Sequence, residues 1–315
     1  MVLATWNLEN LFLPGEGDGP RDQPAYERKL DALAGTIGEL APDVLAVQEV
    51  GDPRALDDLV ERLGGSWNVA LAGVREGERS IRVGFVSKPA LDSVEEVLAF
   101  PDGLEPIQVE DGGVPQREMG RPALKARIRI ENRTVDLVTC HLKSKLLTYP
   151  DGRFQPRDED ERARYAGYAL FRRTAEAVTL RAYVNRLLEG AGDERAVALL
   201  GDLNDEPLAA TTQIFHGPPG SEIGTPGFEQ PDKGDPWRLW NLAWRIPAER
   251  RHSRRFRGRD ELIDHILVSH ALVHDVESVD TGPGEPPSIT ETPSARRDEP
   301  GSDHLPVVAR FAPPA

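Results

Sequence analysis

Five apolar, strand-like runs of this sequence adjoin polar side chains that suit a metal and phosphate site. The runs are VLATW before Asn7, DVLAVQ before Glu49, VDLVTC before His141, AVALLG before Asp202, and LPVVARF after Asp303 and His304. Strand packing needs only the apolar residues, so the carboxylate, amide and imidazole groups indicate chemistry. Because ligands of α/β sheets bind at the carboxyl ends of strands, we expect these groups to meet in one site.

The segment GDLNDEP (201–207) holds Asp202 and Asn204 two residues apart, so both point the same way in an extended backbone. A carboxylate at this place can take a proton from water, and a neighbouring amide can orient that water or hold a phosphoryl oxygen. The alternative is a strand-to-helix turn with an Asp or Asn cap. Asp205 suits that capping role better than Asp202.

Two further segments combine Asp with His. In SDHLPV (302–307), Asp303 and His304 are adjacent and can serve one site only at a loop tip; a plain surface turn is the alternative. Asp264 opens the strand in LIDHILVS and can hold His304 in one tautomer and raise its basicity. The alternative for Asp264 is a pairing with a nearby Arg.

Glu49 ends an apolar run, where an unpaired buried carboxylate is costly. A hard divalent cation is a natural partner, and an Arg is the alternative. Because Mg²⁺ keeps several waters and needs only one or two protein carboxylates, Glu49 and Asp303, supported by Asn7, suffice. We therefore predict Mg²⁺ or Mn²⁺. The single cysteine and the predominance of oxygen donors argue against structural zinc.

Substrate contacts are predicted at three polar side chains near these runs. Lys143 and Lys145 of HLKSK add positive charge beside His141, which can contact a phosphoryl oxygen or protonate a leaving group. Asn10 of WNLENLF is the third candidate. The alternatives are a solvated strand end for His141 and a left-handed turn for the asparagines.

An Arg-rich run, RRHSRRFRGRDE (250–261), contains Phe256 and follows Trp244. It is either a phosphate-binding strip with a stacking platform or a solvated loop that pairs with local acids.

The remaining pattern predicts the elements that position these residues. Apolar residues from Tyr26 to Leu40 recur at spacings of four and three, which is typical of one helix face. Helices are also predicted over 54–63 and 158–189, a half-exposed strand over 124–130, and a loop over 100–120. Hairpins are predicted from 82–88 with 91–100, and from 262–269 with 273–279. This set favours an α/β fold with two packed sheets flanked by helices.

Length and charge limit the classes of function. The 315 residues carry 53 acids against 38 Lys and Arg, a formal charge of −15, which argues against a protein that coats nucleic acid through phosphate neutralisation. No linker separates two cores, so we expect a single domain over 1–315. A β-run begins directly after Met1, so no signal peptide or membrane span is expected and a cytoplasmic location is predicted. A chain whose signal peptide had been removed would look the same. The oligomeric state stays open.

Together WNLEN, the QE strand end at 48–49, HLKSK, GDLND, IDH and SDHLP resemble, in this order, the endonuclease/exonuclease/phosphatase superfamily. The resemblance implies a deoxyribonuclease-I-like four-layer α/β/β/α sandwich with two mixed sheets, and metal-dependent phosphoester hydrolysis. It implies that Asn7, Glu49 and Asp303 surround the metal and that Asp202, beside Asn204, activates the attacking water. His304, oriented by Asp264, would contact the scissile phosphate. His141 matches the catalytic histidine of deoxyribonuclease-like members, whereas exonuclease-III-like members carry tyrosine there.

Three functions follow as hypotheses. The favoured one is a metal-dependent phosphodiesterase, with nucleic acid as the favoured substrate. The second is a phosphatase or phosphodiesterase that acts on a small phosphorylated compound or a lipid headgroup. The third is a non-catalytic binding module on the same fold.

Overall fold

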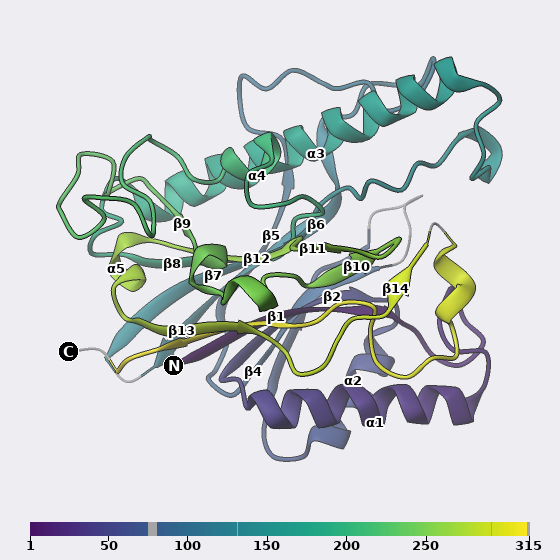
Figure 1. The fold of residues 1–315 in the computed structure, drawn as a ribbon, viewed down its shortest axis with the longest axis horizontal. Helices are drawn as coiled ribbons and strands as arrows, with labels where there is room; N and C mark the ends of the chain where they lie inside the picture. The colour runs from purple at the N-terminus through teal and green to yellow at the C-terminus, as the bar shows by residue number, and fades with distance from the viewer. Residues whose placement is uncertain (75–80, 131, 291, 314–315) are drawn as a thin grey trace.

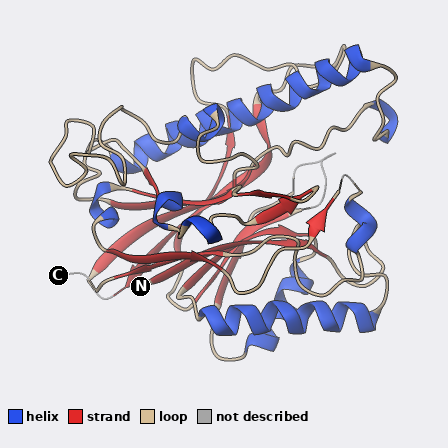
Figure 2. Ribbon diagram, viewed as in Figure 1, coloured by secondary structure: helices blue, strands red, loops and turns tan. Residues whose placement is uncertain are grey.

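Two large β-sheets lie face to face in the computed structural model, with helices on their outer faces (Figures 1 and 2). The structure describes residues 1–74, 81–130, 132–290 and 292–313. Helices α1 and α2 cover one sheet, and α3 covers the other (Figure 1). The predicted four-layer α/β/β/α sandwich is confirmed.

Both large sheets are mixed, as predicted. In the first, only β1 and β2 are parallel neighbours; in the second, only β7 and β8 are. The first sheet has the order β13 (Val276–Thr281), β15 (Val307–Phe311), β1 (Val2–Leu11), β2 (Val44–Val50), β4 (Arg82–Ser87) and β3 (Asn68–Leu71). The second has the order β5 (Asp92–Ala99), β6 (Glu118–Ile130), β7 (Arg133–His141), β8 (Ala196–Asp202), β12 (Asp264–Val268) and β9 (Trp240–Asn241). A small third sheet contains β11 (Arg259–Glu261), β10 (Arg254–Phe256) and β14 (Ser288–Ile289).

The long helices begin at side-chain caps. Asp22 accepts a hydrogen bond from the Ala25 backbone N–H at the start of α1, and Asp158 accepts one from Glu161 at the start of α3. These caps satisfy backbone donors that have no partner within the helix. The helices are α1 (Gln23–Leu40), α2 (Pro53–Leu63), α3 (Glu159–Leu188), α4 (Ala210–Gln213) and α5 (His270–Val273). Among the described residues, no helix combines the length and apolar character that a membrane crossing requires.

Alternation along the strands decides which side chains reach the space between the sheets. In β1, Leu3 faces the other sheet, whereas Ala4, Trp6 and Leu8 pack against the helices. Because side chains two residues apart share a face, Thr5 and Asn7 continue the inward row that Leu3 begins. The polar residues at the strand ends therefore lie at the edge of the inter-sheet core.

Both predicted hairpins are wrong. β4 pairs with β2 and β3 in the first sheet, whereas β5 pairs with β6 in the second, so residues 88–91 cross between sheets. Likewise β12 belongs to the second sheet and β13 to the first. In each case the two strands pair with other strands, in different sheets. β6 also begins at Glu118, inside the segment predicted as a loop, because it pairs with β5 as far as Ala99.

Gly201 allows β7 and β8 to approach each other directly before Asp202. Its φ is +149°, and a Cβ here would overlap the Cys140 backbone carbonyl. We expect Gly201→Ala to lower the free energy of unfolding by about 1–3 kcal/mol, since the clash is with backbone and cannot relax by a rotamer change. Urea unfolding measures it.

Gly35→Ala is the matched control. Gly35 lies within α1 with open space around its Cα, so we expect a gain of about 0.5–1 kcal/mol from helix propensity. A loss at Gly35, or no loss at Gly201, would contradict the packing described.

Candidate active site

Five strand ends converge at one edge of the inter-sheet core. The inward rows of β7, β8 and β12 contain Leu137, Leu200 and Ile266, and two-residue spacing brings His141, Asp202 and Asp264 into the same rows. Register then places both His141 and Asp264 directly opposite Asp202. The sequence-predicted residues of the second sheet are therefore neighbours.

The loop that carries Asp303 and His304 is attached to β1. The Trp6 indole N–H donates to the His304 backbone carbonyl at 2.8 Å, and the Ser302 hydroxyl donates to the Asn7 carbonyl at 2.6 Å. β15 runs antiparallel to β1, so the loop before β15 lies beside the C-terminal half of β1. These contacts therefore place Asp303 and His304 at the same edge of the core as Asn7. The predicted loop-tip arrangement is present.

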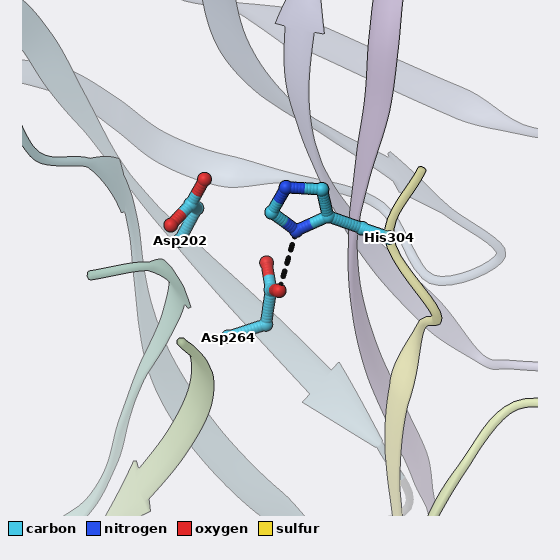
Figure 3. Close-up of side chains that lie close together, drawn as sticks. All are labelled: Asp202, Asp264 and His304. Atoms are coloured by element: carbon cyan, nitrogen blue, oxygen red, sulfur yellow. Dashed lines mark hydrogen bonds and ion pairs between the residues drawn. The ribbon is translucent and has the colours of Figure 1, made fainter. Parts of the chain in front are cut away.

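His304 and Asp264 form a buried pair. His304 Nδ1 lies 2.6 Å from Asp264 Oδ2, and Asp202 faces the same ring (Figure 3). Burial alone would lower the pKa of His304, but the negative charges of Asp264 and Asp303 and the hydrogen bond to Asp264 raise it to about 10. The imidazole is therefore cationic at neutral pH.

Asn7 connects carboxylates from the two sheets. Its Nδ2 donates to Glu49 Oε1 at 3.2 Å and to Asp202 Oδ2 at 3.0 Å. Its Oδ1 accepts from the Glu9 backbone N–H at 3.0 Å, which fixes the orientation of the amide. His141 Nε2 lies 3.4 Å from Asp202 Oδ2 and 4.0 Å from Glu49 Oε1.

Asp202 is a buried carboxylate. It is 1% exposed, and the Asn204 backbone N–H donates to its Oδ1 at 2.8 Å. Burial, followed by the negative charge of Asp264, raises the pKa of Asp202 to about 7. A carboxylate with a pKa near neutrality is well matched to accept a proton from water.

The backbone around the site adopts unusual conformations. Glu9, Asn10, Glu49 and Asn204 have φ between +49° and +60°, in the left-handed region that non-glycine residues rarely occupy. At Glu49 this turn breaks the strand alternation, and the Asn10 N–H donates to Glu49 Oε2 at 2.9 Å. The carboxylate is thereby aimed into the site.

A cavity of about 350 Å³ opens over this cluster. Nine of the eleven sequence-predicted residues line it: Asn7, Asn10, Glu49, His141, Lys145, Asp202, Asn204, Asp303 and His304. Asp264 lies behind His304. Lys143 is not among the lining residues, because its Nζ donates to the Leu146 carbonyl at 2.7 Å and it lines the neighbouring cavity. The roles assigned to all eleven residues stay predictions.

Other charged residues near this cavity escaped the sequence analysis. Glu9 and Arg121 line the cavity, and buried Lys29 donates to the Gly301 carbonyl at 2.7 Å. Glu9 accepts from Arg296, and burial together with the charge of Asp303 raises the pKa of Glu9 to about 7. WNLEN contained the only sequence signal, for Glu9; nothing marked the cations.

The Arg-rich run divides between the two interpretations. Arg254 and Phe256 line the cavity, with the Arg254 guanidinium 5.1 Å from the Phe256 ring centre. Arg255 instead pairs with Asp260 and Glu285, and Trp244 lines a different cavity. Asp205 caps no helix; it accepts from Thr211 and Arg173.

The oxygen donors fit a hard divalent cation. Glu49 and Asp303 line the cavity, and the Glu49 side chain is 20% exposed. The buried Oδ1 of Asn10 has no hydrogen-bond partner among the described residues, which leaves an oxygen donor beside Glu49. Asn7, by contrast, directs its nitrogen at the two carboxylates and orients them.

A second grouping has metal-like geometry. Ligand atoms of Asp202, Asp264 and His304 lie within 4.8 Å of one another, the one such grouping found in the described part of the chain. Protonated imidazole does not bind metal, and His304 already pairs with Asp264. This group is therefore less suited to a metal ion than the oxygen donors on the Glu49 side.

Comparison with known proteins agrees with this geometry. Residues 4–304 match the model of the Endonuclease/Exonuclease/phosphatase family. No curated protein sequence matches the chain.

Solved structures share the fold over almost the whole chain. A mannosyl-6-phosphatase from Bacteroides thetaiotaomicron has a TM-score of 0.60 at 16% identity, covering 99% of each chain. The human Nocturnin catalytic domain has 0.55 at 16%, covering 99% of this chain and 94% of its own. A 3′-5′ exonuclease from Neisseria meningitidis has 0.55 at 18%, covering 99% and 100%. At such identities the likeness concerns the fold alone.

The Asp264–His304 pair generates a stability prediction. Asp264→Ala leaves a buried imidazolium without its partner, so we expect the free energy of unfolding to fall by about 3–5 kcal/mol in urea unfolding. Asp260→Ala, which breaks an exposed pair with Arg255, should cost less than about 1 kcal/mol. Equal losses would show that the pair at His304 is not buried as described.

Proposed function

Because this chain belongs to the Endonuclease/Exonuclease/phosphatase family and is therefore a metal-dependent phosphoesterase, we propose that it hydrolyses phosphodiesters and acts as a nuclease. One observation carries the proposal: a buried carboxylate, Asp202, stands between a cationic His304 and the carboxylate of Glu49 in one cavity. Hydrolysis of a P–O bond needs a base, a cation for the phosphoryl oxygens and a metal ligand, and these are the three groups.

Asp202 takes the proton from an in-line water. Hydrogen bonds from Asn7 Nδ2 and the Asn204 N–H hold its two oxygens, so the carboxylate needs no reorganisation during the reaction. His304, fixed by Asp264, places positive charge at the phosphoryl oxygens. His141 stands beside Asp202 and either contacts a phosphoryl oxygen or donates to the leaving oxygen.

Glu49 and Asp303 would hold Mg²⁺ or Mn²⁺, with Asn10 Oδ1 as a further oxygen donor. When bound, such an ion withdraws charge from the phosphoryl and leaving oxygens. Asn7 holds the Glu49 carboxylate near Asp202 through hydrogen bonds to both.

A small phosphorylated substrate is the second candidate. The formal charge of −15 disfavours long polyanions, and the cavity over the cluster is only about 350 Å³. Plasmid, single-stranded oligonucleotide and inositol phosphate, each supplied with Mg²⁺, Mn²⁺ or EDTA, separate the two. Turnover of inositol phosphate alone would replace the nuclease assignment.

Asp202→Asn tests the base. The amide cannot accept the proton, so we expect kcat on an oligonucleotide to fall by about 10²–10⁴-fold. Asp193→Asn, at the opposite end of β8 and exposed, should keep wild-type turnover. Circular dichroism confirms that both variants fold; an active Asp202→Asn enzyme would refute the role.

Metal binding should stabilise the folded chain, because a cation relieves the repulsion between clustered carboxylates. At a free concentration 100-fold above its Kd, Mg²⁺ should add about 2.7 kcal/mol to the free energy of unfolding relative to EDTA. Glu49→Gln should abolish most of this gain in the same urea titration. A full gain in the variant would place the cation elsewhere.

A further inference from the structure

A second, larger cavity adjoins the active site. It measures about 650 Å³ and shares Arg121, Ser144 and Leu146 with the cavity over Asp202. Its walls come from the segment after β7, the first half of α3 and the residues before β6. The catalytic role proposed above uses none of its interior residues.

Three cations line this second cavity in an acidic protein: Arg121, Lys143 and Arg172. Arg121 donates to the backbone carbonyls of His141 and Leu142 and forms no ion pair with any carboxylate that the structure describes. Burial and the neighbouring arginines lower the pKa of Lys143 to about 7. Mutual repulsion among these neighbouring cations favours the binding of an anion in the cavity.

Carboxylates are scarce among the described residues that line this cavity. Among the described lining residues the sole carboxylate is Glu110, which is exposed. Behind the wall, buried Glu176 accepts from Arg172 Nε at 3.3 Å and from the Lys143 N–H at 2.7 Å. Glu176 therefore holds the Arg172 guanidinium and the Lys143 backbone, whereas Arg121 is held by backbone carbonyls.

Gly120 makes room for one of the cations. A Cβ at this position would overlap the Arg172 guanidinium, and the Gly120 N–H donates to Glu176 at 3.1 Å. The absence of a side chain in β6 thus allows Arg172 to reach the cavity wall beside Arg121.

Aromatic rings form the rest of the wall. Tyr149 and Tyr165 have ring centres 5.1 Å apart, and Tyr165 and Tyr168 are 5.3 Å apart. Phe154 lines the same cavity and is 55% exposed. Tyr149 and Tyr165 are buried, so Phe154 offers the exposed ring of this wall. An exposed ring next to cations suits a ligand that combines a planar ring with phosphate, because rings stack on such side chains.

We propose that this second cavity is a nucleotide subsite, which binds the phosphate and base adjacent to the scissile phosphodiester. The inference rests on the proposed phosphodiesterase function and names its substrate: a chain with at least two phosphates linked through a nucleoside. Arg121, on the wall between the cavities, lies between the two phosphates. Arg172 and Lys143 hold the second phosphate, and Phe154 and the tyrosines contact the base.

Two substrates test the subsite. Bis(p-nitrophenyl) phosphate has one phosphate and no base, whereas trithymidylate fills both cavities. Arg172→Gln and Phe154→Ala should each lower kcat/KM for trithymidylate about tenfold and leave kcat/KM for the minimal diester unchanged. Arg162→Gln, an exposed residue on the same helix that pairs with Glu159, is the matched control and should change neither.

Each outcome of these measurements supports or overturns the subsite. Equal losses on both substrates, or no loss on trithymidylate, would overturn the subsite while the phosphodiesterase function stands. If the wild-type enzyme cleaves neither substrate, the proposed function fails, and the subsite is judged by calorimetry with 5′-phosphorylated dithymidylate in EDTA. Binding that Arg172→Gln weakens about tenfold would then support the subsite, and equal binding would overturn it.

Discussion

The site depends on a single amide that connects two sheets. Asn7 from β1 donates to Glu49 beside it and to Asp202 across the inter-sheet core, so two like charges share one NH₂ group. Below it, buried Gln48 donates to Thr5 in its own sheet and to Thr139 in the other. The spacing of the sheets therefore sets the spacing of the catalytic groups, and core packing serves the chemistry directly.

The second constraint is electrostatic. Several acids lie close together where a cation and a phosphate are proposed to bind, and positive groups next to them offset the repulsion. Buried His304 lies beside Asp264, and buried Lys29 and half-buried Arg296 lie beside Glu9. A similar pairing occurs beside the second cavity, where buried Glu176 accepts from the Arg172 guanidinium and from the Lys143 backbone N–H. Glu9 and Glu49 adopt left-handed backbone conformations that orient their carboxylates toward the site. Such conformations are strained and are common at functional sites.

The alternation of side chains along each strand explains which site residues could be predicted from the sequence. Asn7, His141 and Asp202 follow inward apolar residues at two-residue spacing, so a strand assignment nearly suffices to bring them together. The local pattern does not determine which strands pair with each other. The predicted hairpins were wrong because β4 pairs in the first sheet and β5 pairs in the second. The sequence pattern favours a helix-surface position for Arg172, with a substrate role as the alternative. Its place in the second cavity depends on a glycine more than fifty residues away.

The attachment of the Ser302–His304 loop to β1 has a consequence for folding. Trp6 and His304 are 298 positions apart, and contacts this distant in sequence form late because loop closure must precede them. The Asp264–His304 pair and the cavity over Asp202 are therefore completed only when this loop docks on β1.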